Sequence, residues 1–90
     1  MLLKPEVVRA LEREQRMCTA AIERLKERSH PLEQQYGWST ELFLEKFNTG
    51  EAGDEQVFFQ WFAVAEAIKD WQKTYDSLNE LLADAELMHA

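Results

Sequence analysis

The sequence predicts an all-helical protein that folds as an antiparallel hairpin of two long helices joined through a short connecting helix. Over two long segments, apolar or small residues recur at alternating steps of three and four, which places them on one face of a helix. Three glycines and two prolines in 90 residues leave few turns, whereas a sheet protein of this size would need more. Ninety residues suffice for one hydrophobic core, so we expect a single domain over residues 1–90.

The first long helix is expected over residues 5–36. Pro5 suits its first turn, where no amide hydrogen is needed, and Gly37 suits a left-handed C-cap. Pro31 removes one backbone hydrogen bond and crowds the preceding turn, so we expect a break or kink near residues 29–31. With Gln15 filling one gap, the seam of this helix consists of Val8, Leu11, Cys18, Ile22, Leu25, Ser29, Leu32 and Tyr36.

The connecting helix is expected over residues 40–48, because Ser39 can cap its N-terminus. Asp54 is a suitable N-cap for the second long helix, which we expect over residues 54–86 and which contains no glycine or proline. The seam of this helix follows the alternating steps without a gap and consists of Val57, Trp61, Val64, Ile68, Trp71, Tyr75, Leu78, Leu82 and Ala85.

The apolar stripe of the second long helix is wide over residues 57–65 and narrow from Trp71 onward. A wide stripe needs two neighbouring elements, so we expect the connecting helix to cover this part. The aromatic core expected there contains Phe43, Phe47, Phe58, Trp61, Phe62 and Trp38. A two-helix hairpin still leaves apolar surface exposed, which predicts a protein partner or a homo-oligomer, most simply a dimer that forms a four-helix bundle.

The charge of the chain is strongly negative and unevenly distributed, with a net charge of −7. Residues 1–45 carry seven Lys or Arg against eight Asp or Glu, whereas residues 46–90 carry three against nine. An acidic half repels phosphate, which argues against direct nucleic-acid binding and favours a basic protein partner. The alternative is that the acidity only keeps a small protein soluble. Because no apolar run is long enough to cross a bilayer and the N-terminus does not resemble a signal peptide, we expect a cytoplasmic location without membrane contact.

The sequence offers no constellation typical of an enzyme, a metal site or a cofactor site, and we expect none of the three. The one Glu-x-x-His spacing, Glu27 to His30, lies directly before Pro31, and a bundle metal site would need a second copy. Cys18 falls on the seam of the first helix, where cysteine behaves as a small hydrophobe.

Aromatic side chains of the second long helix are the candidate partner-binding residues. Trp, Tyr and Phe often anchor protein interfaces, although aromatics at helical spacing are more typical of a core. The candidates are Phe58, Phe59, Trp61, Phe62 and Tyr75. Of these, Phe59 points away from the seam.

A segment in the middle of the chain resembles a known family. The resemblance is carried by Tyr36-Gly37-Trp38-Ser39-Thr40-Glu41-Leu42-Phe43-Leu44-Glu45-Lys46-Phe47, then Gly50-Glu51, Gly53-Asp54-Glu55 and Phe59-Gln60-Trp61. This pattern is similar to that of small helical prokaryotic proteins that are encoded beside a small toxin-like protein and are regarded as antitoxins. The resemblance covers residues 36–71, implies a toxin-like partner and implies no catalytic residue.

Three functional hypotheses follow from these observations. The first is an antitoxin-like binding protein. Its second long helix, which is acidic and carries aromatic side chains, docks on a basic partner and occludes it. The second is a self-assembling structural or adaptor bundle that has no toxin partner. The third, an enzyme, is disfavoured because no acid, base or metal cluster is present in the sequence pattern.

Overall fold

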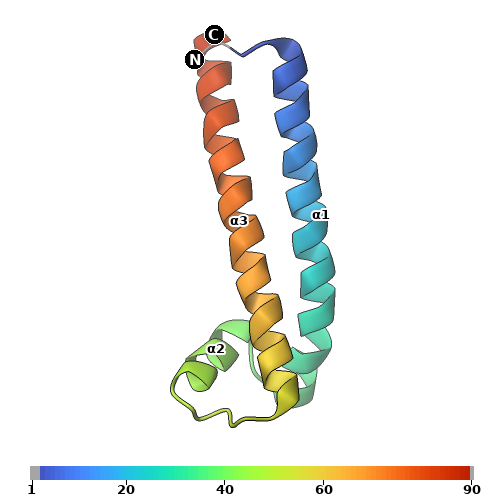
Figure 1. Ribbon diagram of the computed structural model, residues 1–90, viewed down its shortest axis with the longest axis vertical. Helices are drawn as coiled ribbons and strands as arrows, with labels where there is room; N and C mark the ends of the chain where they lie inside the picture. The colour runs from blue at the N-terminus through green and yellow to red at the C-terminus, as the bar shows by residue number, and fades with distance from the viewer. Residues whose placement is uncertain (1–2, 90) are drawn as a thin grey trace.

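Two long helices lie side by side along almost the whole length of the chain, and a short helix sits at one end of the pair (Figure 1). The computed structural model describes residues 3–89, and side chains over residues 3–85. The helices are α1 (Pro5–Tyr36), α2 (Thr40–Asn48) and α3 (Gln56–His89). The Cα atoms span 52 × 21 × 18 Å, as expected for a hairpin of long helices. This architecture confirms the predicted all-helical hairpin.

Both α1 and α2 have the bounds and the caps that the sequence predicts. Gly37 adopts the left-handed conformation (φ 69°) and its amide donates to the carbonyl of Glu33 at 2.9 Å, which closes the last turn of α1. At the start of α2, the Ser39 hydroxyl accepts a hydrogen bond from the amide of Leu42 at 3.1 Å. The two caps leave only three residues between α1 and α2, so α2 must fold back at once beside the hairpin.

The third helix begins two residues later than predicted, at Gln56 rather than Asp54. Gly53 lies before it in a left-handed conformation (φ 96°), and at the start of the helix the amide of Phe58 donates a hydrogen bond to the carbonyl of Glu55 at 3.0 Å. The connector is therefore two residues longer than the sequence pattern indicates. The backbone of α3 then continues to His89, three residues beyond the predicted end.

The predicted break near residues 29–31 is wrong, because α1 is continuous through Pro31. Ser29 is almost fully buried (4% exposed) and Leu32 packs against the aromatic core, so packing holds the helix on both sides of the proline. Pro31 itself lies on the exposed side of the helix. Its missing amide leaves the carbonyl of Glu27 without the usual helical partner, in a place where solvent can satisfy it.

The predicted seam joins α1 to α3. Every seam position on α1 is buried or half-buried, with Cys18 and Ile22 most deeply enclosed. On α3 the same holds except for Trp71, which remains 38% exposed because it has only one neighbouring helix. The Gln15 amide donates to the side-chain oxygen of Asn79 at 3.2 Å, so this polar residue of the α1 seam is paired across the hairpin.

The alignment of α1 against α3 can be read from contacts at two distant points. Gln15 pairs with Asn79, and the rings of Tyr36 and Phe58 lie 5.0 Å apart. Residues of α1 and α3 whose numbers add up to about 94 are therefore level with each other along the hairpin.

The aromatic core forms where the sequence predicts it, between α2 and the wide part of the α3 stripe. Phe43, Phe58 and Trp61 are buried at its centre, and Trp38, Phe47 and Phe62 pack around them. Phe43 and Trp61 are stacked almost parallel, with ring centroids 4.0 Å apart and an interplanar angle of 2°. Such a contact adds to the free energy gained by removing both rings from water.

Replacing Phe43 with alanine tests whether this core holds the fold. We expect Phe43→Ala to lower the free energy of unfolding by about 3–5 kcal/mol, because it removes a fully buried ring and leaves a cavity. The matched control is Leu42→Ala, the neighbouring residue, which is 40% exposed and should change stability by less than about 1 kcal/mol. Urea denaturation followed by circular dichroism measures both. Equal effects of the two substitutions would contradict the assignment.

Replacing Pro31 with alanine tests the account of the continuous helix. Alanine restores the amide hydrogen and favours the helix, so Pro31→Ala should raise the free energy of unfolding by about 1–3 kcal/mol. Gln34→Ala, at another exposed position of α1, is the control and should have little effect. A thermal melt that shows Pro31→Ala to be destabilised would mean that the proline makes a contact on which the helix depends.

Candidate protein-interaction surfaces

The residues weighed for chemistry are not brought together by the fold. Cys18 is fully buried in the seam, where it packs as a small hydrophobe. His30 lies on the exposed surface with its Nδ1 3.8 Å from a carboxylate oxygen of Glu33. Within the described residues, no group of three or more His, Cys, Asp or Glu side chains is arranged so that it could hold a metal ion.

The five predicted anchor residues divide into two groups. Phe58 and Trp61 are buried in the aromatic core, so they have almost no surface to offer a partner while the chain is folded. Phe62 and Tyr75 are half-buried, and Phe59 is 54% exposed. The ring of Phe59 rests edge-on against Phe47 (centroids 5.3 Å apart, 86°), which holds it in place at the surface. Of the five, Phe59 is the best placed to contact another molecule.

A groove of about 700 Å³ lies where the three helices meet, and we call it the junction groove. It is bounded by the C-terminal half of α1, the first turns of α2 and the middle of α3. The groove is lined by Glu23, Lys26, Glu27, Ser29, His30, Pro31, Glu33, Thr40, Glu41, Leu44, Ala65, Ile68 and Lys69. The sequence analysis did not identify it, because it depends on how α2 folds back.

A chain of hydrogen bonds fixes the end of this groove where α2 begins. The Thr40 amide and hydroxyl both donate to one carboxylate oxygen of Glu33, at 2.8 and 2.9 Å. The indole N–H of Trp61 in turn donates to the Thr40 hydroxyl at 3.2 Å. One residue of each helix thus takes part, and the indole N–H enters the core with a partner. The chain holds α2 at a defined angle to the hairpin, so the groove is preformed.

The lining of the junction groove is apolar at its floor and mainly acidic at its rim. Leu44, Ala65 and Ile68 supply apolar surface from α2 and α3. The rim carries four glutamates (Glu23, Glu27, Glu33 and Glu41) against two lysines (Lys26 and Lys69). Lys69 is itself paired with Glu66 at 3.2 Å, which lowers the positive charge available at the rim. The groove is therefore suited to an apolar segment that carries positive charge.

A second surface lies on the other side of the hairpin. In an antiparallel helix pair, residues that directly precede seam positions lie on one side, and residues that directly follow them lie on the other. Lys69, in the groove, follows the seam residue Ile68, whereas Leu81 precedes the seam residue Leu82. At about 100° per residue, the positions directly before and directly after a seam residue lie about 160° apart around the helix.

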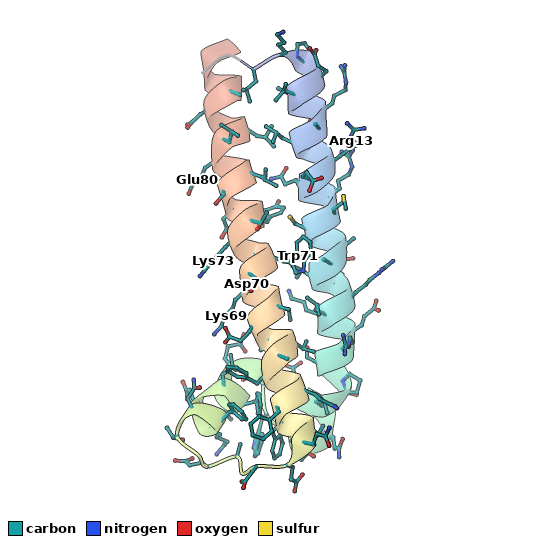
Figure 2. The ribbon with its side chains drawn as sticks, viewed as in Figure 1. Arg13, Lys69, Asp70, Trp71, Lys73 and Glu80 are labelled. Atoms are coloured by element: carbon teal, nitrogen blue, oxygen red, sulfur yellow. The ribbon has the colours of Figure 1, made fainter. Side chains whose placement is uncertain are left out.

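We call this second surface the Trp71 face. Its apolar members are the seam residues Trp71 and Leu78 and five residues that directly precede seam positions: Val7, Ala10, Met17, Ala21 and Leu81. The charged residues Glu14 and Asp84 also directly precede seam positions in this stretch, so they interrupt the apolar surface. Met17 is 58% exposed, Val7 is 39% exposed and Trp71 is 38% exposed; the other apolar members are half-buried. Figure 2 shows Trp71 between the two long helices, while Arg13 and Glu80 point away from opposite edges of the hairpin. Three large apolar side chains of this face are thus left exposed on a highly charged protein.

Comparisons with known proteins give no further guidance. The chain matches no protein-family model, and it matches neither a curated protein nor a solved structure. The likeness to antitoxin-like proteins therefore rests on the quoted residues alone. Among the helices that the structure describes, none combines the length and the hydropathy that crossing a bilayer requires.

Removing the Thr40 hydroxyl tests the hydrogen-bond chain that shapes the groove. Thr40→Val keeps the volume but leaves the indole N–H of Trp61 without its acceptor, so we expect a loss of about 1–3 kcal/mol in unfolding free energy. Thr19→Val is the control, because its hydroxyl bonds only to the Gln15 carbonyl on the exposed surface of α1. A result in which both variants are equally stable would show that the bond from Trp61 to Thr40 contributes nothing.

Proposed function

We propose that this chain is a non-enzymatic protein-interaction module that works in the manner of an antitoxin, by binding a basic segment of a partner protein and occluding it. The observation that carries the proposal is the junction groove, in which apolar side chains lie beside four glutamates and two lysines. The net charge of −7 supports the same conclusion, because it attracts a basic protein from a distance. The resemblance of residues 36–71 to antitoxin-like proteins is consistent with it.

The partner segment that fits this groove is a basic amphipathic helix or strand. Its apolar side chains would cover Leu44, Ala65 and Ile68, and its lysine or arginine side chains would pair with the glutamates at the rim. The Glu27 carbonyl, left without a helical partner by Pro31, offers a further acceptor beside the rim. Phe59 lies outside this lining, so a larger partner could contact it in addition.

Binding would act by occlusion: the chain would cover a segment of the partner without changing it chemically. A segment held between α1, α2 and α3 is no longer available to its own target. The charge complementarity mainly raises the association rate, whereas the apolar floor slows dissociation. The same proposal includes a cytoplasmic location, for which the free thiol of Cys18 is suitable.

Co-purification with the products of the neighbouring reading frames tests this proposal. We expect a basic protein to co-elute with the tagged chain at low salt and to be released as the salt concentration rises. Glu27→Lys combined with Glu41→Lys should weaken this binding by roughly tenfold or more, because it reverses two charges at the rim.

The control for this experiment places the same charge change outside the groove. Glu6→Lys combined with Glu80→Lys alters the net charge equally, and Glu80 points away from the edge of α3 (Figure 2). This pair should reduce binding only as far as long-range attraction contributes. The proposal fails if no neighbouring product co-elutes at low salt, or if the two double variants weaken binding to the same extent.

A further inference from the structure

The junction groove has two ends that differ in what borders them. Figure 1 shows α2 at the end of the hairpin where α1 ends and α3 begins, so Thr40, Glu41 and Leu44 border the groove on that side. Along α1 the lining extends from Glu33 back to Glu23, which is roughly 15 Å along the helix axis. We call the two ends the α2 end and the Glu23 end.

The α2 end of the groove is acidic. It carries the carboxylates of Glu33 and Glu41, and none of the described residues that line this end is a lysine or an arginine. The one imidazole of the lining, that of His30, lies 3.8 Å from a carboxylate oxygen of Glu33. The lysine of α2, Lys46, pairs with Glu51 at 3.7 Å and does not line the groove.

Both lysines of the groove lie near the Glu23 end. Residues of α1 and α3 whose numbers add up to about 94 are level with each other, so Lys26 and Lys69 stand at nearly the same height. Glu23 and Glu27 lie beside Lys26 on α1, and Glu66 is paired with Lys69 at 3.2 Å. Carboxylates at this end are therefore interspersed with ammonium groups, whereas those at the α2 end are not. This difference gives the groove a direction.

The backbone around the groove favours a helical partner segment over an extended one. All the lining residues belong to α1, α2 or α3, so the groove offers no strand edge with which an extended segment could pair. The amides and carbonyls of such a segment would lack partners wherever side chains cover them. The single free carbonyl of Glu27 does not replace a ladder of hydrogen bonds. A helix brings no such cost, because it satisfies its own backbone groups.

Apolar side chains lie along the groove from one end to the other. Leu44 lies at the α2 end, Ile68 is level with Lys26 near the Glu23 end, and Ala65 is one turn from Ile68 on α3. A helix that presents apolar residues at positions i, i+4 and i+7 covers about 10 Å with one face. The small side chain of Ala65 leaves room for a larger one from the partner.

We propose that the segment bound in the junction groove is a basic amphipathic helix of about three turns, oriented with its N-terminus at the α2 end. This inference rests on the proposed function and adds the conformation, the direction and the charge order of the segment. The bound helix runs parallel to α3 and antiparallel to α1, and its apolar face covers Leu44, Ala65 and Ile68. Its lysine or arginine side chains lie in its first turns, where they face Glu33 and Glu41.

The helix dipole and the side-chain charges both select this direction. The N-terminus of a helix carries partial positive charge, which carboxylates stabilise, and the C-terminus carries partial negative charge, which lysines stabilise. The proposed direction sets the N-terminus beside Glu33 and Glu41 and the C-terminus beside Lys26 and Lys69. The reverse direction loses both contacts and sets like charges against each other. We expect the two directions to differ by about tenfold in affinity.

A spin-labelled peptide bound to the full chain tests the direction. The probe is a synthetic helical peptide of about 14 residues with leucines at i, i+4 and i+7, lysines in its first turns and a nitroxide at one end. With the nitroxide at the N-terminus, we expect the strongest paramagnetic broadening at the amides of Glu41 and Leu44. With the nitroxide at the C-terminus, the amides of Glu23 and Lys26 should be broadened most. The opposite pattern would overturn the inference.

Peptides of identical composition separate direction and conformation from charge alone. A second peptide carries its lysines in the last turns, and a third alternates its leucines as a strand would. A hydrocarbon staple on the face opposite the leucines keeps the first two equally helical, which circular dichroism verifies. Fluorescence anisotropy should show that the first peptide binds the full chain about tenfold more tightly than either of the others. Equal affinities of the two helical peptides, or no binding of the first, would overturn the inference.

A substitution at the α2 end tests the same point from the side of the protein. Glu41→Gln should weaken binding of the first peptide by roughly threefold or more and change that of the second by less than about twofold. The matched control is Glu45→Gln, which is exposed on the same helix but outside the lining and should leave both affinities unchanged. Because Glu41 and Glu45 are both exposed, each variant should keep its fold. Equal weakening of both peptides by Glu41→Gln would contradict the proposed direction.

The inference and the proposed function fail in different experiments. If a neighbouring product co-elutes and Glu27→Lys with Glu41→Lys releases it, equal binding of the two helical peptides overturns only the inference. If the first peptide binds in the expected direction but no neighbouring product co-elutes, the groove accepts a basic helix and the antitoxin-like role fails.

Discussion

The stack of Phe43 on Trp61 is the contact on which the arrangement of all three helices depends. Trp61 belongs to the seam between α1 and α3, yet its ring also reaches Phe43 of α2 at a centroid distance of 4.0 Å. Its indole N–H donates to Thr40, which is bonded to Glu33 of α1. A single side chain therefore joins the seam to the helix that folds back on it, by burial and by hydrogen bonding together. Without this contact α2 would have no fixed place, and the junction groove would lose one wall.

This constraint also explains why the two sides of the hairpin differ. On one side α2 covers the wide part of the α3 stripe and leaves a groove between its first turns and the long helices. On the other side nothing lies over the upper half of the pair, so Trp71 and Met17 remain exposed. One side carries a groove whose charged lining residues are mainly acidic, and the other exposes Trp71, Met17 and Val7. The two sides of the hairpin therefore differ in shape and in composition.

Most of the fold could be predicted from the sequence because its signals are local or periodic. The seams of α1 and α3 follow heptad spacing, and the caps at Gly37 and Ser39 are properties of single residues. The aromatic core follows from the width of the α3 stripe. The prediction at Pro31 was wrong, because tertiary packing of Ser29 and Leu32 outweighs the loss of one hydrogen bond on the exposed side of the helix.

The candidate surfaces could be predicted only in part. Phe59 was expected to point away from the seam, and it is exposed. Phe58 and Trp61 were expected both in the core and as anchors, and spacing alone does not separate these roles; burial does. The groove combines residues of three helices, so no local pattern indicates it. Pro31 only identifies one backbone carbonyl, that of Glu27, which lacks a helical partner. The Trp71 face becomes visible only when the alignment of α1 with α3 is known.

Amide hydrogen exchange of the free chain tests most directly whether α2 is held on the hairpin as described. The account predicts that the amides of Phe43 and Phe47 exchange as slowly as those of Cys18 and Val64, since α2 can open only when the aromatic core opens. Exchange in α2 that is faster by orders of magnitude, while α1 and α3 stay protected, would contradict it. In that case α2 would detach from an intact hairpin, and the junction groove would not be a preformed site.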